Sequence, residues 1–198
     1  TQASVDGDNV YVVAPDGKEY AKFPVHRYRD YVAEHVEPWS YMKFCYLKPL
    51  GWQGFNEGEK SSIYAVGPMA RLNAAEGMAT PLAQQACDEY FQALGGRPVH
   101  HTLANHWARI VEMIQAAERM NEILDDPQLL NPDVRTLPTA KPANGCGVVE
   151  APRGTLIHHY KVGTDDLVTM CNLIVSTTHN NEGMNRAVGW VADHVISG

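Results

Sequence analysis

The sequence predicts an α+β fold that is mainly helical, and three observations support this class. Apolar residues recur at helical spacing near 99–124 and again near 180–196. Residues close to the N-terminus alternate around a Pro-Asp-Gly turn, which is typical of a β-hairpin. Alternating segments near 146–175 predict a small antiparallel sheet. We expect residues 1–198 to form a single domain, or a fragment of a larger one.

The elements expected first along the chain are short. Residues 10–13 and 19–23 are expected to pair as strands, because Ala-Pro-Asp-Gly-Lys at 14–18 favours a reversal of the chain. A short helix is expected over 25–36, ending before a proline. The residues that would share its apolar face are Tyr28, Val32 and Val36. Residues 38–81 are rich in Gly, Pro and aromatic side chains without a helical period, which predicts an irregular stretch packed by aromatic burial.

The clearest element is a long helix over 99–124. Its apolar stripe follows i, i+3, i+4 spacing and consists of Leu103, Trp107, Ile110, Ile114, Ala117 and Leu124. Because further apolar residues at Val111, Met113 and Met120 widen this stripe, we expect the helix to be buried on more than one side. Asp-Asp-Pro at 125–127 ends it, and a proline-rich connection follows.

The C-terminal part alternates between strands and a helix. Segments 146–151, 155–162 and 167–175 are expected to be strands, with the last two joined at 163–166. A final helix is expected to begin near 180. One face of that helix would carry Met184, Val188, Val191 and Val195.

Composition excludes several classes of function. The net charge of −7 argues against a nucleic-acid surface, because phosphate backbones attract clustered Lys and Arg. No apolar run approaches the roughly 18 residues of a membrane span. The first residues have neither a basic nor an apolar stretch typical of a secretory signal. We therefore expect a cytoplasmic protein without a membrane span.

Cysteine and histidine patterns provide no metal-ligand set. Cys45, Cys87, Cys146 and Cys171 are far apart, so the chain has no Cys-x-x-Cys pair, and reduced thiols are expected. Three histidines (100, 101 and 106) lack the i, i+4 spacing of a helical metal site. Neighbouring histidines 158 and 159 would point to opposite faces of a strand. A histidine-rich metal-binding protein is thus the weakest interpretation of the sequence.

One motif carries the functional interpretation. Glu-Ala-Pro-Arg-Gly at 150–154 places a guanidinium on a corner between two extended segments, because the proline fixes the backbone and the glycine lets it turn. This motif resembles the one in the large subunit of nickel–iron hydrogenases. The resemblance continues in order through segments 37–44, 46–51, 66–73, 106–112, 124–127, 172–181 and 184–186. It is closest to cytoplasmic, multi-subunit enzymes that reduce NAD or feed electrons towards heterodisulfide reductase. Complete large subunits of that family carry a Cys-x-x-Cys pair near each end, so this sequence resembles their middle.

The resemblance implies roles for four residues beside a Ni–Fe(CN)2CO centre. Arg153 would place its guanidinium over the open side of the metal pair, and Pro152 would shape the pocket wall. Thr177 would donate a hydrogen bond to a cyanide ligand, and the adjacent Ser176 is the alternative hydroxyl. The purely structural alternatives are a salt bridge or carbonyl cap for Arg153, and a backbone hydrogen bond at a strand end or helix N-terminus for the hydroxyls. No residue of this chain is expected to ligate metal, so no Ni–Fe centre is expected on this chain alone.

The implied reaction is the reversible conversion of H2 into protons and electrons. The implied partners are an iron–sulfur small subunit and further electron-transfer subunits, and the 198-residue chain alone is expected to be inactive. The alternative is a non-catalytic scaffold homologue that lost the metal site. The aromatic stretch and the wide apolar face of the long helix also predict that the chain alone associates or needs a partner.

Overall fold

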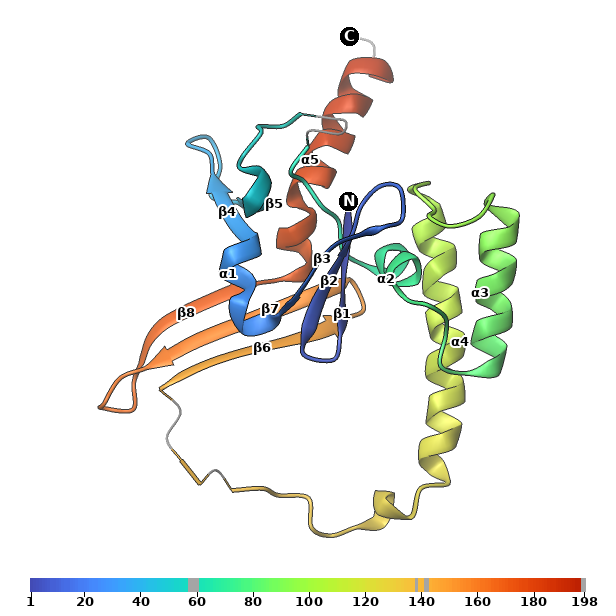
Figure 1. Cartoon of the computed structure of the whole chain (residues 1–198), viewed down its shortest axis with the longest axis vertical. Coiled ribbons are helices and arrows are strands. Elements are labelled where there is room, and N and C mark those ends of the chain that lie inside the picture. Colours follow the sequence, from blue (N-terminus) through green and yellow to red (C-terminus); the bar gives the residue numbers. More distant parts are fainter. Residues whose placement is uncertain (57–60, 138, 141–142, 197–198) are drawn as a thin grey trace.

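The computed structural model describes residues 1–56, 61–137, 139–140 and 143–196. Within these ranges the chain forms three small antiparallel sheets and five α-helices, so the fold is mixed α+β (Figure 1). The described residues form eight strands beside these five helices, whereas the sequence predicted a mainly helical protein. Two groups of buried side chains form the core. One joins the N-terminal strands to the C-terminal sheet, and the other lies among three helices.

The N-terminal sheet contains β1 (Gln2–Asp6), β2 (Asn9–Val13) and β3 (Glu19–Pro24) in that order. The expected hairpin of β2 and β3 is confirmed. Gly17 has a φ of +85° in its turn. The sequence did not predict β1, whose polar residues do not alternate in the usual way. It forms because Ala3 pairs with Val12 and donates its N–H to Ala65 O at 2.9 Å.

The predicted helix over 25–36 is wrong. A 3-10 turn (Val25–Arg27) and a single helical turn, α1 (Tyr28–Tyr31), lead into strand β4 (Val32–Val36). Valines four residues apart suit either structure, and β-branched side chains favour a strand once a partner is present. That partner is β5 (Lys43–Leu47), which pairs antiparallel with β4.

Residues 38–81 are more ordered than the sequence predicted. They contain β5, a 3-10 turn (Lys48–Leu50) and helix α2 (Pro68–Ala74), although residues 57–60 lie outside the described ranges. The expected aromatic packing is confirmed around Phe55, whereas Trp39 and Tyr41 are 59% and 100% exposed. Phe55 forms edge-on contacts with Phe44 and Trp52 at centroid distances of 5.1 and 5.4 Å.

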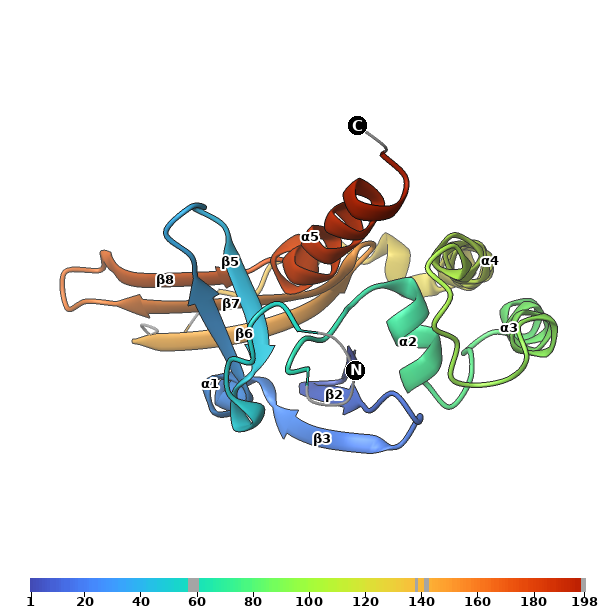
Figure 2. The same cartoon turned by 90° about the horizontal axis from the view of Figure 1, so that it is seen from above.

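Helices α3 (Pro81–Ala93) and α4 (Ala104–Leu124) lie side by side at the edge of the molecule (Figures 1 and 2). The sequence did not predict α3, and α4 begins later than the predicted residue 99. The buried positions of α4 are Ala104, Ala108 and Val111. By contrast, Leu103 and Ile110 are 79% and 56% exposed. The small alanines let α2 and α3 approach closely, so the packed face lies one residue away from the predicted stripe. The expectation of burial on several sides is therefore wrong for this chain.

A long connection with a 3-10 turn (Pro127–Leu130) leads from α4 to the C-terminal sheet. This sheet contains β6 (Asn144–Ala151), β7 (Gly154–Val162) and β8 (Val168–Ile174), which confirms the three predicted strands. Helix α5 (Ser176–His194) begins directly after β8, earlier than predicted, and lies beside the sheet (Figure 2). No helix among the described residues is long and apolar enough to cross a membrane.

Candidate functional site

The turn between β6 and β7 presents Pro152 and Arg153 at the surface. Because Ala151 pairs with Gly154, only these two residues connect the strands. Both side chains are exposed. Within the described part of the chain, no hydrogen bond or ion pair engages the Arg153 guanidinium. The salt-bridge alternative for Arg153 therefore has no support among these residues.

The turn lies against the segment that precedes α2. Gly154 has a φ of +131°, and a Cβ atom there would lie 2.4 Å from Val66 Cγ2 and 2.9 Å from Gly67 N. Only glycine permits so close an approach in this backbone region. Asn180 of α5 fixes the same segment: its Oδ1 accepts from Val66 N at 2.9 Å, and its Nδ2 donates to Val66 O at 3.0 Å.

Helix α5 begins beside the turn, so the two segments singled out in the sequence meet. Ser176 is only 4% exposed, and its hydroxyl donates to Gly154 O at 2.7 Å. The neighbouring Thr177 is exposed, and no described residue hydrogen-bonds with its side chain. The Ser176 hydroxyl therefore stabilises the turn, whereas the adjacent Thr177 is exposed and free of described partners.

Arg71 of α2 lies against the same turn, although no local pattern in the sequence predicts a role for it. Its guanidinium binds Glu112 of α4 in a bidentate pair at 2.5 and 2.7 Å, and Glu150 of β6 at 2.7 Å. Burial opposes the charged form, but the hydrogen bonds to the two carboxylates raise the pKa of Arg71 above its ordinary value. The three residues lie in distant segments without a shared period, so only the folded chain reveals the group.

The neighbouring histidines of β7 point to opposite faces, as predicted. His159 is buried, with Nδ1 3.1 Å from Tyr28 Oη and Nε2 2.8 Å from Asn144 Oδ1. Burial lowers its pKa, as do the nearby positive charges of Arg29 and Lys161. Among the described residues, no three His, Cys, Asp or Glu side chains are grouped to hold a metal ion. All four cysteines are free thiols.

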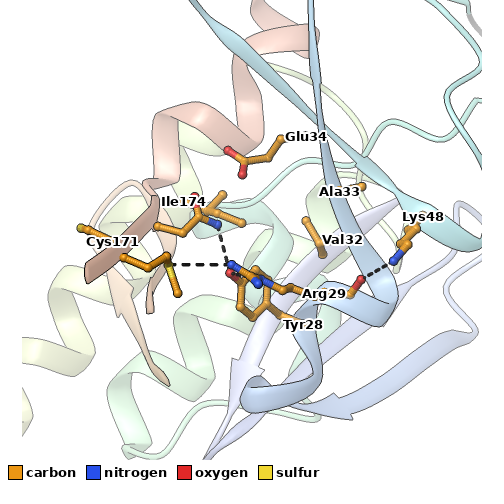
Figure 3. A pocket seen from close by; sticks show the side chains of 10 residues that line it. Tyr28, Arg29, Val32, Ala33, Glu34, Lys48, Cys171 and Ile174 are labelled. Atoms are coloured by element: carbon orange, nitrogen blue, oxygen red, sulfur yellow. Dashed lines mark hydrogen bonds between the residues drawn. The ribbon is translucent and has the colours of Figure 1, made fainter. Parts of the chain in front are cut away.

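A separate pocket of about 420 Å3 lies between β4 and β8 (Figure 3). Its polar groups bind one another: Asn172 Nδ2 donates to Tyr28 Oη at 3.0 Å, and Lys48 Nζ donates to Arg29 O at 2.8 Å. Arg29 Nε also donates to Tyr28 Oη, at 3.1 Å. Because several of its polar groups already bind one another, this pocket is a weaker candidate than the Arg153 turn.

The inner face of α5 buries two titratable groups. His179 Nδ1 lies 2.5 Å from Tyr64 Oη, and burial lowers the pKa of His179 to about 4. Glu182 is 0% exposed, and its carboxylate has no hydrogen-bond partner among the described residues. Arg186 Nε is 4.0 Å away. Burial raises the pKa of Glu182 to about 7, so folding favours its protonated form.

Replacing Glu182 by glutamine is expected to stabilise the fold at alkaline pH. The raised pKa means that the folded state holds the proton more tightly than the unfolded state, whose carboxyl titrates near 4.5. The contribution of this group to stability is thus greatest below pH 4.5 and is lost as the pH rises through about 7. Urea denaturation should show a gain of about 1–2 kcal/mol for Glu182→Gln at pH 8, and none at pH 4.5. Glu122→Gln, on an exposed face of α4, is the control with no such pH-dependent gain. An equal gain at both pH values would contradict the prediction.

Comparison with known proteins places these features in a family. The profile of the family described as nickel-dependent hydrogenase matches residues 43–189. The chain is 48% identical over 180 residues to an iron–sulfur subunit of the F420-non-reducing hydrogenase of Archaeoglobus profundus, covering 91% of this chain and 37% of that protein. It is 41% identical over 202 residues to the beta subunit of the NAD-reducing hydrogenase HoxS of Cupriavidus necator, covering 98% and 40%.

A solved structure agrees with these relatives. The crystal structure of an NAD+-reducing [NiFe]-hydrogenase in the H2-reduced state superposes with a TM-score of 0.85 at 40% identity. The match covers 98% of this chain and 43% of that one. The chain thus spans about two fifths of the length of these relatives. With a profile match over most of the sequence and a shared fold, the chain belongs to the nickel-dependent hydrogenase family.

Proposed function

We propose that residues 1–198 form one unit of the catalytic subunit of a nickel–iron hydrogenase, which interconverts H2 with two protons and two electrons. The observation that carries the proposal is the Arg153 turn. A guanidinium free of described partners projects from a two-residue turn that Ser176, at the start of α5, fixes through Gly154 O, and the next residue of α5 is the exposed Thr177. A scaffold has no need of a cation held in this way.

The exposed groups suit the surroundings of a Ni–Fe(CN)2CO centre but not its thiolate shell. Thr177 offers a hydroxyl donor, which suits a cyanide nitrogen as acceptor. The cysteines do not suit nickel or iron ligation: Cys45 and Cys87 are buried within the core, and no two cysteines are close in sequence. Thiolates from elsewhere in the complete subunit would hold the metals. When bound, such a centre supplies the redox chemistry that cleaves H2.

The residues of this chain would stabilise charge at the metal centre and orient the groups around it. Arg153 would stabilise negative charge that develops at the centre, because a fixed cation needs no reorganisation during the reaction. It is a poor proton acceptor, since arginine keeps its own proton. Pro152 would hold the adjacent backbone and exclude water. Ser176 supports the turn through Gly154 O, which leaves Thr177 as the donor to the cofactor.

We also propose partner subunits and a cellular location for the complete protein. Electrons would leave through an iron–sulfur small subunit and further electron-transfer subunits, and the complex would work in the cytoplasm. The names of the relatives support only the multi-subunit part of this proposal, since the matched proteins are subunits of hydrogenases, including an NAD-reducing one. The alternative function is that of a non-catalytic, metal-free scaffold homologue.

Hydrogen-dependent reduction of a viologen dye tests the proposal. The complete subunit, produced with its partner subunits and maturation factors, is expected to reduce the dye under H2. The 198-residue chain produced alone is expected to give no reduction. A metal-free complete complex without H2-dependent reduction would reject the catalytic proposal in favour of the scaffold.

A further inference from the structure

Arg71 lies against the turn that carries Arg153, and its hydrogen-bonding capacity is fully used there. Its Nε and Nη2 donate to the two carboxylate oxygens of Glu112 at 2.5 and 2.7 Å. Its Nη1 donates to Glu150 Oε2 at 2.7 Å and to Ala151 O at 2.9 Å. Nη2 also donates to Pro152 O at 3.3 Å. A guanidinium has five N–H donors in a planar fork, and these contacts use all five.

The Arg153 side chain depends on this backbone for its position. No described residue bonds to its guanidinium, so among the described residues only the backbone of the turn sets where the side chain begins. Arg71 holds the carbonyl groups of Ala151 and Pro152, and Ser176 holds that of Gly154. Carbonyls before and after Arg153 are therefore fixed by side chains from α2 and α5.

We propose that Arg71 is a positioning residue for the reaction: it holds the 151–152 backbone so that the Arg153 side chain leaves the turn from a fixed place. This inference rests on the function proposed above. Glu112 and Glu150 take part by anchoring Arg71 to α4 and β6. Glu150 is itself fixed, because its Oε1 accepts from Thr155 Oγ1 at 2.7 Å. Through this group, α2, α4 and the C-terminal sheet together determine the position of one cation.

Lysine in place of Arg71 separates positioning from charge. It keeps the positive charge but has only three donors and no planar fork, so it cannot bind two carboxylates and two carbonyls together. In the complete, partnered subunit, Arg71→Lys is expected to lower kcat for H2 oxidation at least 10-fold. The KM for H2 and the nickel and iron contents are expected to stay unchanged, because Arg71 would touch neither substrate nor metal.

Two further measurements report on positioning without relying on turnover. The infrared cyanide and carbonyl bands of the complete enzyme are expected to shift in Arg71→Lys, because a displaced cation changes the field at these ligands. Deuterium uptake at residues 152–155 is expected to become faster than in the wild type. A residue that only stabilised the fold would lower the melting temperature while leaving kcat per folded molecule and the infrared bands unchanged.

A second variant guards against a folding failure of Arg71→Lys. Glu112→Ala removes the anchor on α4 but keeps Arg71. We expect kcat, the infrared bands and deuterium uptake to change in the same direction as in Arg71→Lys, by a smaller amount. Arg119→Lys, an exposed arginine of the same helix, is the matched control and should change none of them. Wild-type kcat, bands and uptake in folded Glu112→Ala and Arg71→Lys would overturn the proposal. A wild-type complex without Ni–Fe bands would reject the proposed function instead, and the deuterium uptake would still decide whether Arg71 holds the turn.

Discussion

Arg153→Lys in the complete, partnered subunit is expected to lower kcat for H2 oxidation by about 10²–10³-fold, the usual effect of losing one fixed stabilising group in an active site. Arg153 is exposed and has no described partner, so its replacement removes no contact that stabilises this chain. Lysine retains the charge, but as a mobile point charge on a flexible stem it lacks the planar, pre-organised donors of arginine. Nickel and iron contents should stay at wild-type values.

The measurement is H2-dependent dye reduction, normalised to nickel content. Arg119→Lys serves as the control, because Arg119 is an exposed arginine on α4 that pairs only locally with Glu122. Turnover of Arg153→Lys within a factor of two or three of the wild type would show that the guanidinium has no part in the reaction. Loss of nickel from the variant would instead indicate a role in assembling the centre.

Gly154→Ala is expected to destabilise the fold by about 3 kcal/mol or more, the largest effect on stability that the structure predicts. Two costs add together. The φ of +131° strains any residue with a Cβ atom, and that atom would lie 2.4 Å from Val66 Cγ2. The backbone nitrogen of Gly67 would lie 2.9 Å from the same atom, so rotation of the Val66 side chain alone could not relieve the clash.

Gly147→Ala provides the matched control. It lies in β6 of the same sheet, and a Cβ atom there would meet no other atom within 4 Å. Urea denaturation should show a change within about 0.5 kcal/mol for Gly147→Ala. Equal free energies of unfolding for Gly154→Ala and Gly147→Ala would show that residues 66–67 do not lie in close contact with the turn.

Where the sequence predicted the fold correctly, local signals and the final packing agree. The Pro-Asp-Gly turn forms the β2–β3 hairpin because Gly17 takes a left-handed conformation. The strands of the C-terminal sheet follow their alternating residues. The prediction was wrong where packing decided between two local choices. Val32 and Val36 fit a helix equally well, and only the pairing with β5 makes them a strand.

The site was predictable only in part. The resemblance predicted roles for Arg153 and Thr177, and the folded chain joins their segments through Ser176 and Gly154. Arg71 carried no signal of its own in the sequence, because its partners Glu112 and Glu150 come from distant segments. Only the folded chain shows that Arg71 binds the carbonyl groups of Ala151 and Pro152.

We propose that this chain supplies groups around a Ni–Fe centre but none of its thiolate ligands. Elemental analysis of the purified 198-residue chain for nickel and iron, with infrared spectra in the cyanide and carbonyl stretching region, tests it most directly. We expect neither metal in stoichiometric amount and no such bands. Stoichiometric nickel and iron with cyanide and carbonyl bands would contradict the claim, because this chain's own side chains would then hold the centre.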